Sequence, residues 1–401
     1  MSDLPASSVA PLVPRRRVLV SLLSAAGVMA LPSCGGGGGG GGVAGVDTGG
    51  TGSFSIGSIV GFGSIIVNGV RFEDNAARVA DDAGGVLSAN DLRLGMVVRV
   101  QAGTITPGSG DVLPSATATS IIVESEIKGR VESKTGTDTL VVFGQTVKVN
   151  AATVFENVTF ATIAVGNILE VSGFADAAGV ITATRIEREG AANEFKVRGV
   201  IANLDAVNRT FQIGSATFIF AGSGVRLPAT PLQNGQFVRV RTTTLQNAAG
   251  QWVVTRIDLR DAVEDRGEAE VEGILVQNGT ALQVNGITID TSRLAAGSVP
   301  AVGQKVEVEG QLVNGVLVAS KIKLEDANEG AQVDVRGAAS AVNKTAQTLV
   351  VRGLTFHYTP GVTEFRNGTV DTLVDGANVR VRGTLPTGGA GAIEATRLEF
   401  Q

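Results

Sequence analysis

The feature that most constrains the fold of this 401-residue chain is a repeat that occupies everything after residue 53. A glycine repeatedly begins a short stretch in which apolar side chains alternate with polar or charged ones. Such alternation predicts a strand that buries one face. The copies are roughly 70 residues apart, which indicates one module repeated along the chain. They are Gly95–Val100, Gly166–Val171, Gly235–Val240, Gly303–Val308 and Gly376–Val381.

Two further landmarks recur in the same order and with the same period. A glycine follows an apolar or charged residue early in each copy, at Ile56-Gly57, Lys128-Gly129, Arg198-Gly199, Glu272-Gly273 and Arg336-Gly337. A closing strand ends each copy, at Thr119–Ile121, Thr184–Ile186, Thr255–Ile257, Ser320–Ile322 and Thr396–Leu398. Because the three markers agree, we predict five β modules. Their bounds are 54–125, 126–190, 191–265, 266–328 and 329–401.

Each module has a β pattern throughout. Asn68-Gly69 lies between two alternating stretches, and Asn285-Gly286 repeats this arrangement, so both pairs predict tight hairpin turns. After the hairpin comes a stretch in which the alternation is weaker, and we expect a loop or one helical turn there. Two more strands complete the module. We therefore predict an all-β fold, a tandem array of five small five-stranded OB-like barrels after a disordered N-terminal segment. Small open β-sandwiches are the alternative.

Three sequence stretches carry a family resemblance. They are Gly61–Phe72, Gly144–Val147 followed by Ala151–Phe155, and Gly166–Gly173 with Ala183–Ile186. In these stretches the chain resembles the bacterial export-associated domain-of-unknown-function family 5666. The likeness extends over residues 54–401, is strongest in the first two modules and is looser in the third, where Thr242 replaces a glycine. The resemblance implies a β-module fold and export, and it brings no catalytic residue.

The N-terminal residues 1–33 have the pattern of a signal peptide. Arg15, Arg16 and Arg17 precede the apolar run Val18–Leu31. This run is shorter than the roughly 20 residues that span a bilayer, but it fits the apolar region of an export signal. The arginines followed by Val18-Leu19 resemble the twin-arginine motif, whose cargo crosses the membrane folded. Ordinary Sec export is the alternative.

The stretch Leu31-Pro32-Ser33-Cys34 resembles a bacterial lipobox, which predicts lipidation of Cys34 and a membrane anchor there. The alternative is an ordinary cleavage site with an incidental thiol. Gly35–Gly42 then predicts a flexible tether over residues 34–53. Gly35 in place of an aspartate favours the outer membrane of a Gram-negative bacterium, and the pattern leaves open whether the protein faces the periplasm or the surface.

The composition excludes several classes of site. One cysteine and one histidine cannot build a disulfide, a His/Cys zinc site, a haem pocket or an iron–sulfur cluster, so we expect no cofactor and no metal. A net charge of −5 disfavours nucleic-acid binding. Only Trp252 and Tyr358 supplement the phenylalanines, which also disfavours sugar stacking and single-strand binding.

Three local patterns favour a structural role over a site. Gly61-Phe62-Gly63 begins like a phosphate-binding loop, but no helix follows it. His357 lies within an expected strand. Two acidic junctions predict solvated linkers, with bound calcium as the alternative. The junction residues are Asp258, Asp261, Glu264 and Asp265, and then Glu325, Asp326, Asn328 and Glu329.

The closing strands carry a recurring cation, at Arg185, Arg256, Lys321 and Arg397. Modules stacked end to end would present these side chains as a row to an anionic polymer. The alternative is an ordinary solvent face, with each cation paired to a neighbouring carboxylate such as Glu170 or Glu307.

The sequence thus predicts a non-enzymatic, lipid-anchored envelope protein that acts as a scaffold or interaction surface, with an envelope protein or polymer as its partner. An envelope binder of an oligosaccharide, a lipid or another anionic polymer is the alternative. An enzyme would need carboxylates that meet across modules, and no spacing in the sequence indicates this.

Overall fold

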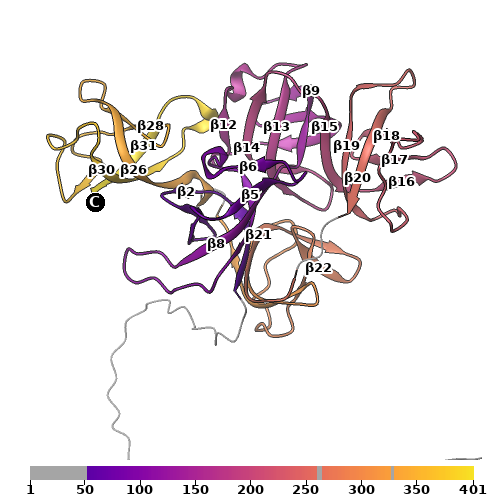
Figure 1. Cartoon of the computed structure of the whole chain (residues 1–401), viewed down its shortest axis with the longest axis horizontal. Helices are drawn as coiled ribbons and strands as arrows, with labels where there is room; N and C mark the ends of the chain where they lie inside the picture. The colour runs from indigo at the N-terminus through magenta and orange to yellow at the C-terminus, as the bar shows by residue number, and fades with distance from the viewer. Residues whose placement is uncertain (1–51, 260–263, 327–328) are drawn as a thin grey trace, which may run out of the picture. The chain divides into compact units, whose positions relative to one another are not determined.

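The computed structural model describes residues 52–259, 264–326 and 329–401 (Figure 1). Val46–Gln401 forms one compact unit by its internal contacts. The described residues form strands and four single 3-10 turns, so the predicted all-β class is confirmed. The predicted export signal at Arg15–Arg17, the predicted lipidation at Cys34 and the predicted tether up to residue 51 lie outside the described residues. The last residue given to the tether, Ser53, begins β1.

The second repeat shows the fold of one unit most simply. Its β9 pairs with β10, β10 with β11, β11 with β14 in parallel, β14 with β13, and β13 with β9 again. This closed circuit is the strand order of an OB-like barrel. The strands are β9 (Ile127–Thr135), β10 (Thr139–Val142), β11 (Gln145–Lys148), β12 (Val154–Glu156), β13 (Ile168–Ala175) and β14 (Ile181–Glu189).

The fourth and fifth units repeat this circuit. In each, the third strand pairs in parallel with the last, and the first strand pairs with the next-to-last. The fourth unit contains β21 (Arg266–Asn278), β22 (Ala281–Val284), β23 (Ile287–Asp290), β24 (Lys305–Val313) and β25 (Val316–Leu324). The fifth contains β26 (Gln332–Asn343), β27 (Thr348–Val351), β28 (Leu354–His357), β29 (Glu364–Arg366), β30 (Asn378–Thr384) and β31 (Ile393–Phe400).

The first and third units divide their first strand in two. The first unit contains β1 (Ser53–Ser58), β2 (Gly61–Phe62), β3 (Ile65–Val67), β4 (Val70–Glu73), β5 (Arg78–Asp81), β6 (Val86–Leu87), β7 (Val97–Ala102) and β8 (Ser115–Glu124). The third contains β15 (Phe195–Val200), β16 (Ala202–Asp205), β17 (Thr210–Ile213), β18 (Ala216–Ile219), β19 (Phe237–Gln246) and β20 (Trp252–Leu259). Both keep the parallel pairing with the last strand.

The hairpin turns explain why Asn-Gly pairs lie between the alternating stretches of the sequence. Asn68 and Gly69 have φ angles of 49° and 72°, and Asn285 and Gly286 have the same values, as expected for a two-residue turn. In the second unit Phe143 takes the asparagine position with φ of 50°, which strains a bulky residue. Its buried ring lies 4.6 Å from Trp252 in the third unit, and this packing offsets the strain.

The described part contains three hydrophobic clusters for five barrels. One joins the first and fifth units, and it includes Phe72 and Phe356. A second joins the second and third units, and it includes Phe143 and Trp252. The third lies in the fourth unit and also takes in Phe54, from β1 of the first unit. Neighbouring barrels therefore share cores and do not each close around their own.

Main-chain pairing joins the units as well. Strand β1 runs parallel to β21, with Ser55 opposite Glu270. Strand β2 runs parallel to β26, and β9 pairs with β15. The first unit therefore bonds to the fourth and fifth, which follow it much later in the sequence (Figure 1).

Candidate functional site

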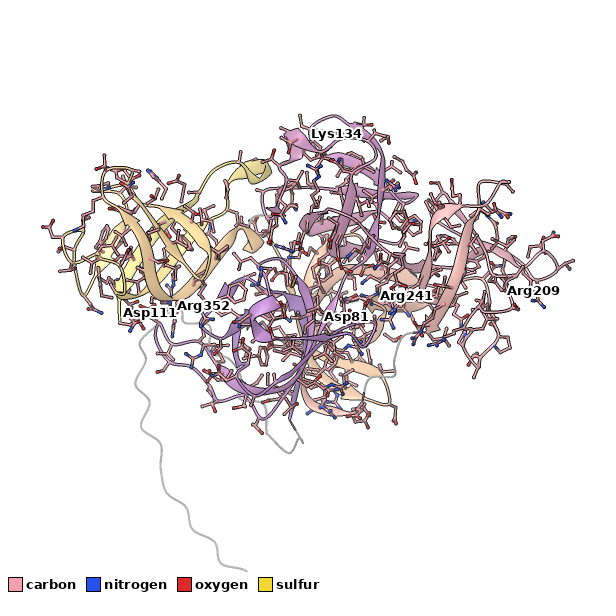
Figure 2. The ribbon with its side chains drawn as sticks, turned by 45° about the horizontal axis from the view of Figure 1, so that its top comes forward. Asp81, Asp111, Lys134, Arg209, Arg241 and Arg352 are labelled. Carbon is pink, nitrogen blue, oxygen red and sulfur yellow. The ribbon has the colours of Figure 1, made fainter. Side chains whose placement is uncertain are left out.

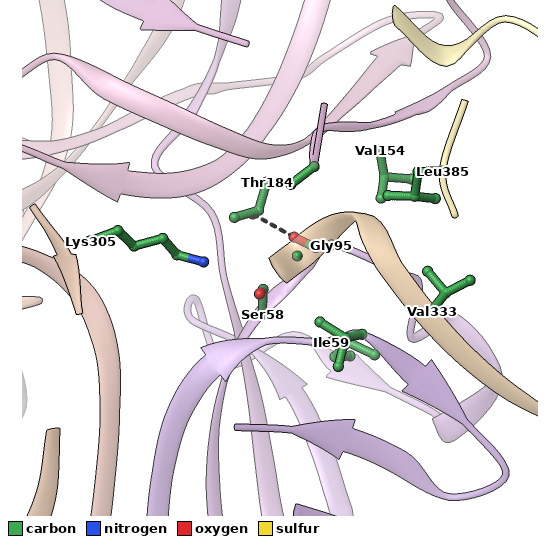
Figure 3. A pocket seen from close by; sticks show the side chains of 11 residues that line it. Ser58, Ile59, Gly95, Val154, Thr184, Lys305, Val333 and Leu385 are labelled. Carbon is green, nitrogen blue, oxygen red and sulfur yellow. Dashed lines mark hydrogen bonds between the residues drawn. The ribbon is translucent and has the colours of Figure 1, made fainter. Parts of the chain in front are cut away.

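A small cavity marks the place where four units meet (Figure 3). The Thr184 hydroxyl donates a hydrogen bond of 2.6 Å to the Gly95 carbonyl across it. Its volume is about 20 Å³, which is room for one water molecule. This cavity is a packed junction and is too small to bind a ligand. The residues around it include Ser58 and Ile59, Val154, Lys305, Val333 and Leu385.

A much larger cleft lies between the first, second and third units. Its volume is about 500 Å³, within the range of small-molecule sites. Figure 2 labels Asp81 of the first unit and Arg241 of the third, which both line it. The rest of the lining is Ala83, Lys128, Glu170, the linker residues 191–194 and Lys196.

Four cations on four neighbouring strands form a row in which each lies opposite the next. We call Lys128, Lys196, Arg241 and Arg256 the cross-strand row. Lys128 on β9 lies opposite Lys196 on β15, and Lys196 lies opposite Arg241 on β19. Arg241 in turn lies opposite Arg256 on β20. Directly opposite residues on paired strands point to the same face, and like charges there are destabilising unless they are compensated.

Carboxylates compensate the two lysines. The Lys128 ammonium lies 3.1 Å from Glu170 and 2.8 Å from Glu189, and Lys196 lies 3.0 Å from Asp82. Burial would raise the pKa of Glu170, but the charges of Lys196 and Lys128 outweigh it and lower that pKa to about 2. Glu170 is therefore a carboxylate at neutral pH and holds both lysines in place.

Arg241 is compensated least. Its residue is 8% exposed, and its Nη1 lies 3.5 Å from Glu194, whose side chain is half exposed. Its Nε and Nη2 are buried and have no hydrogen-bond acceptor among the described residues. At the end of the row, Arg256 Nε donates to Asp258 at 2.7 Å. The cleft therefore contains a buried guanidinium in which two nitrogen atoms, Nε and Nη2, have no acceptor among the described residues.

The four cations predicted from the closing strands lie in four different units. Arg185 is only 3% exposed, and it contacts Glu156, Glu187 and the Leu94 carbonyl. The other three are ion-paired as well, Arg256 with Asp258, Lys321 with Glu309 and Arg397 with Glu364. No hydrogen bond or ion pair within the described ranges joins one of the four to another, and their joint role in ligand binding stays a prediction.

Sequence reasoning missed Lys128, Lys196 and Arg241 as a group. Each is an outward-facing residue of an alternating strand, and the same pattern describes any solvent face. The signal that unites them is the pairing of β9 with β15, which joins two modules. Of the cross-strand row, only Arg256 was also a predicted site residue.

The two acidic junctions contain ion pairs where they are described. Glu264 lies 2.6 Å from Arg266, and Glu325 lies 3.5 Å from Lys305. Asp261 and Asn328 lie outside the described residues. Across the described ranges, no group of three or more His, Cys, Asp or Glu side chains is arranged to hold a metal ion. His357 Nδ1 lies 2.9 Å from Glu394.

Within residues 52–259, 264–326 and 329–401, no helix has the length and apolar character needed to cross a bilayer.

Comparison with solved structures finds distant matches. The Drosophila Unr CSD456 structure is 15% identical, with a TM-score of 0.16, and the match covers 43% of this chain and 79% of that one. No curated protein matches the chain. The barrel assignment therefore rests on the strand circuit itself.

A family model gives the clearest comparison. The model described as "Domain of unknown function (DUF5666)" matches residues 128–187, 261–323 and 330–399. These regions correspond to the second, fourth and fifth units, so the predicted resemblance is confirmed, although the first unit, expected among the strongest, is not one of the three. Three regions of the chain are therefore similar to this domain family.

Proposed function

We propose that this is a non-enzymatic, lipid-anchored protein of the cell envelope whose joined barrels act as a scaffold or interaction surface. The observation that carries the proposal is the main-chain pairing between units, of β1 with β21, β2 with β26 and β9 with β15. Backbone pairing across module boundaries fixes several barrel surfaces with respect to one another. A protein that presents surfaces to partners benefits from such a fixed arrangement.

Buried ion pairs support the same interpretation. Arg198 of the third unit lies 3.0 Å from Glu124, at the end of β8 in the first unit, and 3.1 Å from Glu126, just before β9 of the second. Removing one member of a buried pair leaves the other charge uncompensated, so such pairs favour a single arrangement of the units. We infer that the barrels move as one body when a partner binds.

The membrane part of the proposal rests on the sequence. Cys34 follows an apolar run and precedes eight glycines, as in an acylated cysteine with a flexible tether. Several acyl chains bind a membrane far more firmly than one. The tether would let the barrels reach partners away from the lipid surface.

The anchor is tested by expressing the full chain and its Cys34→Ser variant in a Gram-negative host with labelled palmitate. We expect label and outer-membrane fractionation for the unchanged chain, and neither for the variant. Equal labelling or equal fractionation of the two would exclude the anchor.

The scaffold role is tested by crosslinking in cells followed by purification of the anchored chain. We expect the same envelope protein at low and high salt, and its loss in a Glu272→Ala variant, which weakens the junction of the first and fourth units. Recovery of no specific protein, or of the same protein with both chains, would contradict the scaffold.

An envelope binder of an oligosaccharide, lipid or other anionic polymer is the second candidate. The observation that favours it is the cross-strand row, which places four cations on one face of β9, β15, β19 and β20. A polymer bound through charge would be released by salt, and an Arg256→Ala variant would retain less of it than the unchanged chain.

A further inference from the structure

We propose that the cleft between the first three units binds a small hydrophilic molecule through one carboxylate or phosphate group, with Arg241 as the partner of that group. The proposal goes beyond the scaffold role and does not depend on the membrane anchor. It rests on the cleft, on the state of Arg241 and on the charges around it.

The state of Arg241 is the first argument. Its Nε and Nη2 lie on the same edge of the planar guanidinium, and that edge matches the two oxygens of a carboxylate or phosphate. Both atoms are buried without an acceptor in the described part of the chain. A buried donor that has lost water and gained no acceptor is costly, so an anion that supplies the acceptor is bound with favourable free energy.

The position of Arg241 in the cross-strand row is the second argument. Lys196 lies opposite it on one side and Arg256 on the other. Lys196 and Arg256 each have a carboxylate within 3.0 Å, whereas Arg241 has Glu194 at 3.5 Å. An additional negative charge at Arg241 relieves repulsion between the three cations.

The Glu194 carboxylate is the group that an anionic ligand would replace at Arg241. It belongs to the linker before β15, and its side chain is half exposed. A long contact from a half-exposed carboxylate is weak, because water competes for both partners. An incoming anion therefore replaces Glu194 and lets the guanidinium turn its free edge toward the cleft.

The rest of the lining selects the kind of molecule. Asp81, Glu170 and Glu194 place carboxylates in the cleft, which repel a ligand with many negative charges. The same oxygens accept hydrogen bonds from hydroxyl groups. The apolar lining consists of alanines, without an aromatic ring to stack on a flat ligand. A molecule rich in hydroxyls with one anionic group fits these conditions, and an acidic sugar is the simplest example.

The test uses the Val46–Gln401 fragment, which contains all three hydrophobic clusters. Binding of glucuronate and glucose 6-phosphate is measured by calorimetry, with glucose as the neutral control and inorganic phosphate as the control without hydroxyls on carbon. We expect saturable binding of at least one acidic sugar below about 10 mM and at least about tenfold weaker binding of glucose. The two acidic probes distinguish a carboxylate from a phosphate ligand.

Two variants locate the site. Arg241→Gln is expected to weaken binding by about tenfold or more, because it removes the charged fork. Arg209→Gln, at an exposed arginine of the third unit that is also labelled in Figure 2, is the matched control and is expected to bind normally.

A third variant separates binding from folding. Arg241→Met removes the unsatisfied donors while it keeps a long side chain, so its melting temperature without ligand is expected to be unchanged or higher. Absence of binding by both acidic sugars, equal binding by Arg241→Gln, or a lower melting temperature of Arg241→Met would each overturn the proposal. None of these results depends on whether Cys34 anchors the chain or whether an envelope protein is captured.

Discussion

The Glu272 carboxylate of the fourth unit accepts a hydrogen bond of 2.7 Å from the Ser58 backbone N–H of the first unit. Glu272 is 5% exposed, and it also pairs with Lys305 of its own unit. One buried carboxylate thus holds a main-chain donor at the end of β1 and a cation at the start of β24. The contact lies beside the parallel pairing of β1 with β21, and it closes that junction.

Glu272→Ala is expected to destabilise the junction by about 1.5–3 kcal/mol, because it leaves the buried Ser58 N–H without its acceptor and the Lys305 ammonium with only the more distant Glu325. The free energy of unfolding is measured by urea denaturation followed by circular dichroism. Lys321→Ala, which breaks an exposed pair with Glu309, is the control and is expected to cost less than about 1 kcal/mol. If the two variants lose the same free energy of unfolding, Glu272 does not stabilise the junction as described.

Phe143→Ala is expected to destabilise the second and third units together by about 3–5 kcal/mol, because its ring is buried in their shared cluster. Trp252, the one tryptophan of the chain, lies 4.6 Å from that ring, so its fluorescence reports the loss directly. Val207→Ala, at a side chain that is 90% exposed, is the control. An unchanged Trp252 signal in Phe143→Ala would show that the two units do not share a core.

The stability of the fourth unit is expected to fall as the pH rises from about 4.5 to 8. Burial, and then the charges of Glu309 and Glu268, raise the pKa of Glu270 to about 8. A carboxyl with a raised folded-state pKa stabilises the fold below its unfolded pKa, and this contribution is lost as the pH rises through the folded value.

Glu270→Gln imitates the protonated group, so it is expected to flatten this slope and to be more stable than the unchanged chain at pH 8. Thermal melting across this pH range measures the difference. Asp371→Asn, at an exposed carboxylate of the fifth unit, is the control. A slope that is the same with and without Glu270 would refute this assignment.

The second unit is expected to respond to acid in the opposite direction. Because the pKa of Glu170 is lowered to about 2 despite its burial, its contribution is present above the unfolded pKa and is lost as the pH falls from about 4.5 toward 2. In melting experiments, Glu170→Gln should abolish this loss of stability at low pH, and it should lower stability at pH 7. If Glu170→Gln loses as much stability at low pH as the unchanged chain, Lys128 and Lys196 do not stabilise the Glu170 carboxylate as described.

The sequence predicted what depends on local pattern. Asn68-Gly69 and Asn285-Gly286 supply the left-handed turn conformation that a two-residue hairpin needs, so their positions follow from residue type alone. The glycine-led strands, with an apolar residue at alternate positions, likewise specify a half-buried strand wherever they occur. The closed strand circuit of each barrel follows from these elements taken in order.

The arrangement of the barrels could not be predicted in this way. Phe54 and Ile56 belong to β1 of the first unit, but they pack into the cluster of the fourth. Nothing in an alternating strand says which distant edge will pair with it, because every exposed edge offers the same backbone groups. For the same reason Arg241 looked like any outward-facing cation until the pairing of β15 with β9 and β19 placed it beside a cleft.

Strand pairing joins the units, and disulfide formation between β1 and β21 tests this pairing in solution. Ser55 and Glu270 lie opposite each other on these strands, and the Val46–Gln401 fragment has no cysteine of its own. Neighbouring positions on paired strands fall within the distance that a disulfide bridges. We predict rapid crosslinking on oxidation of a Ser55→Cys, Glu270→Cys fragment. We predict none in a Ser55→Cys, Glu309→Cys control, whose second position lies one strand farther away on β24. Failure of the first pair to crosslink, or equal crosslinking of both, would show that β1 and β21 are not paired.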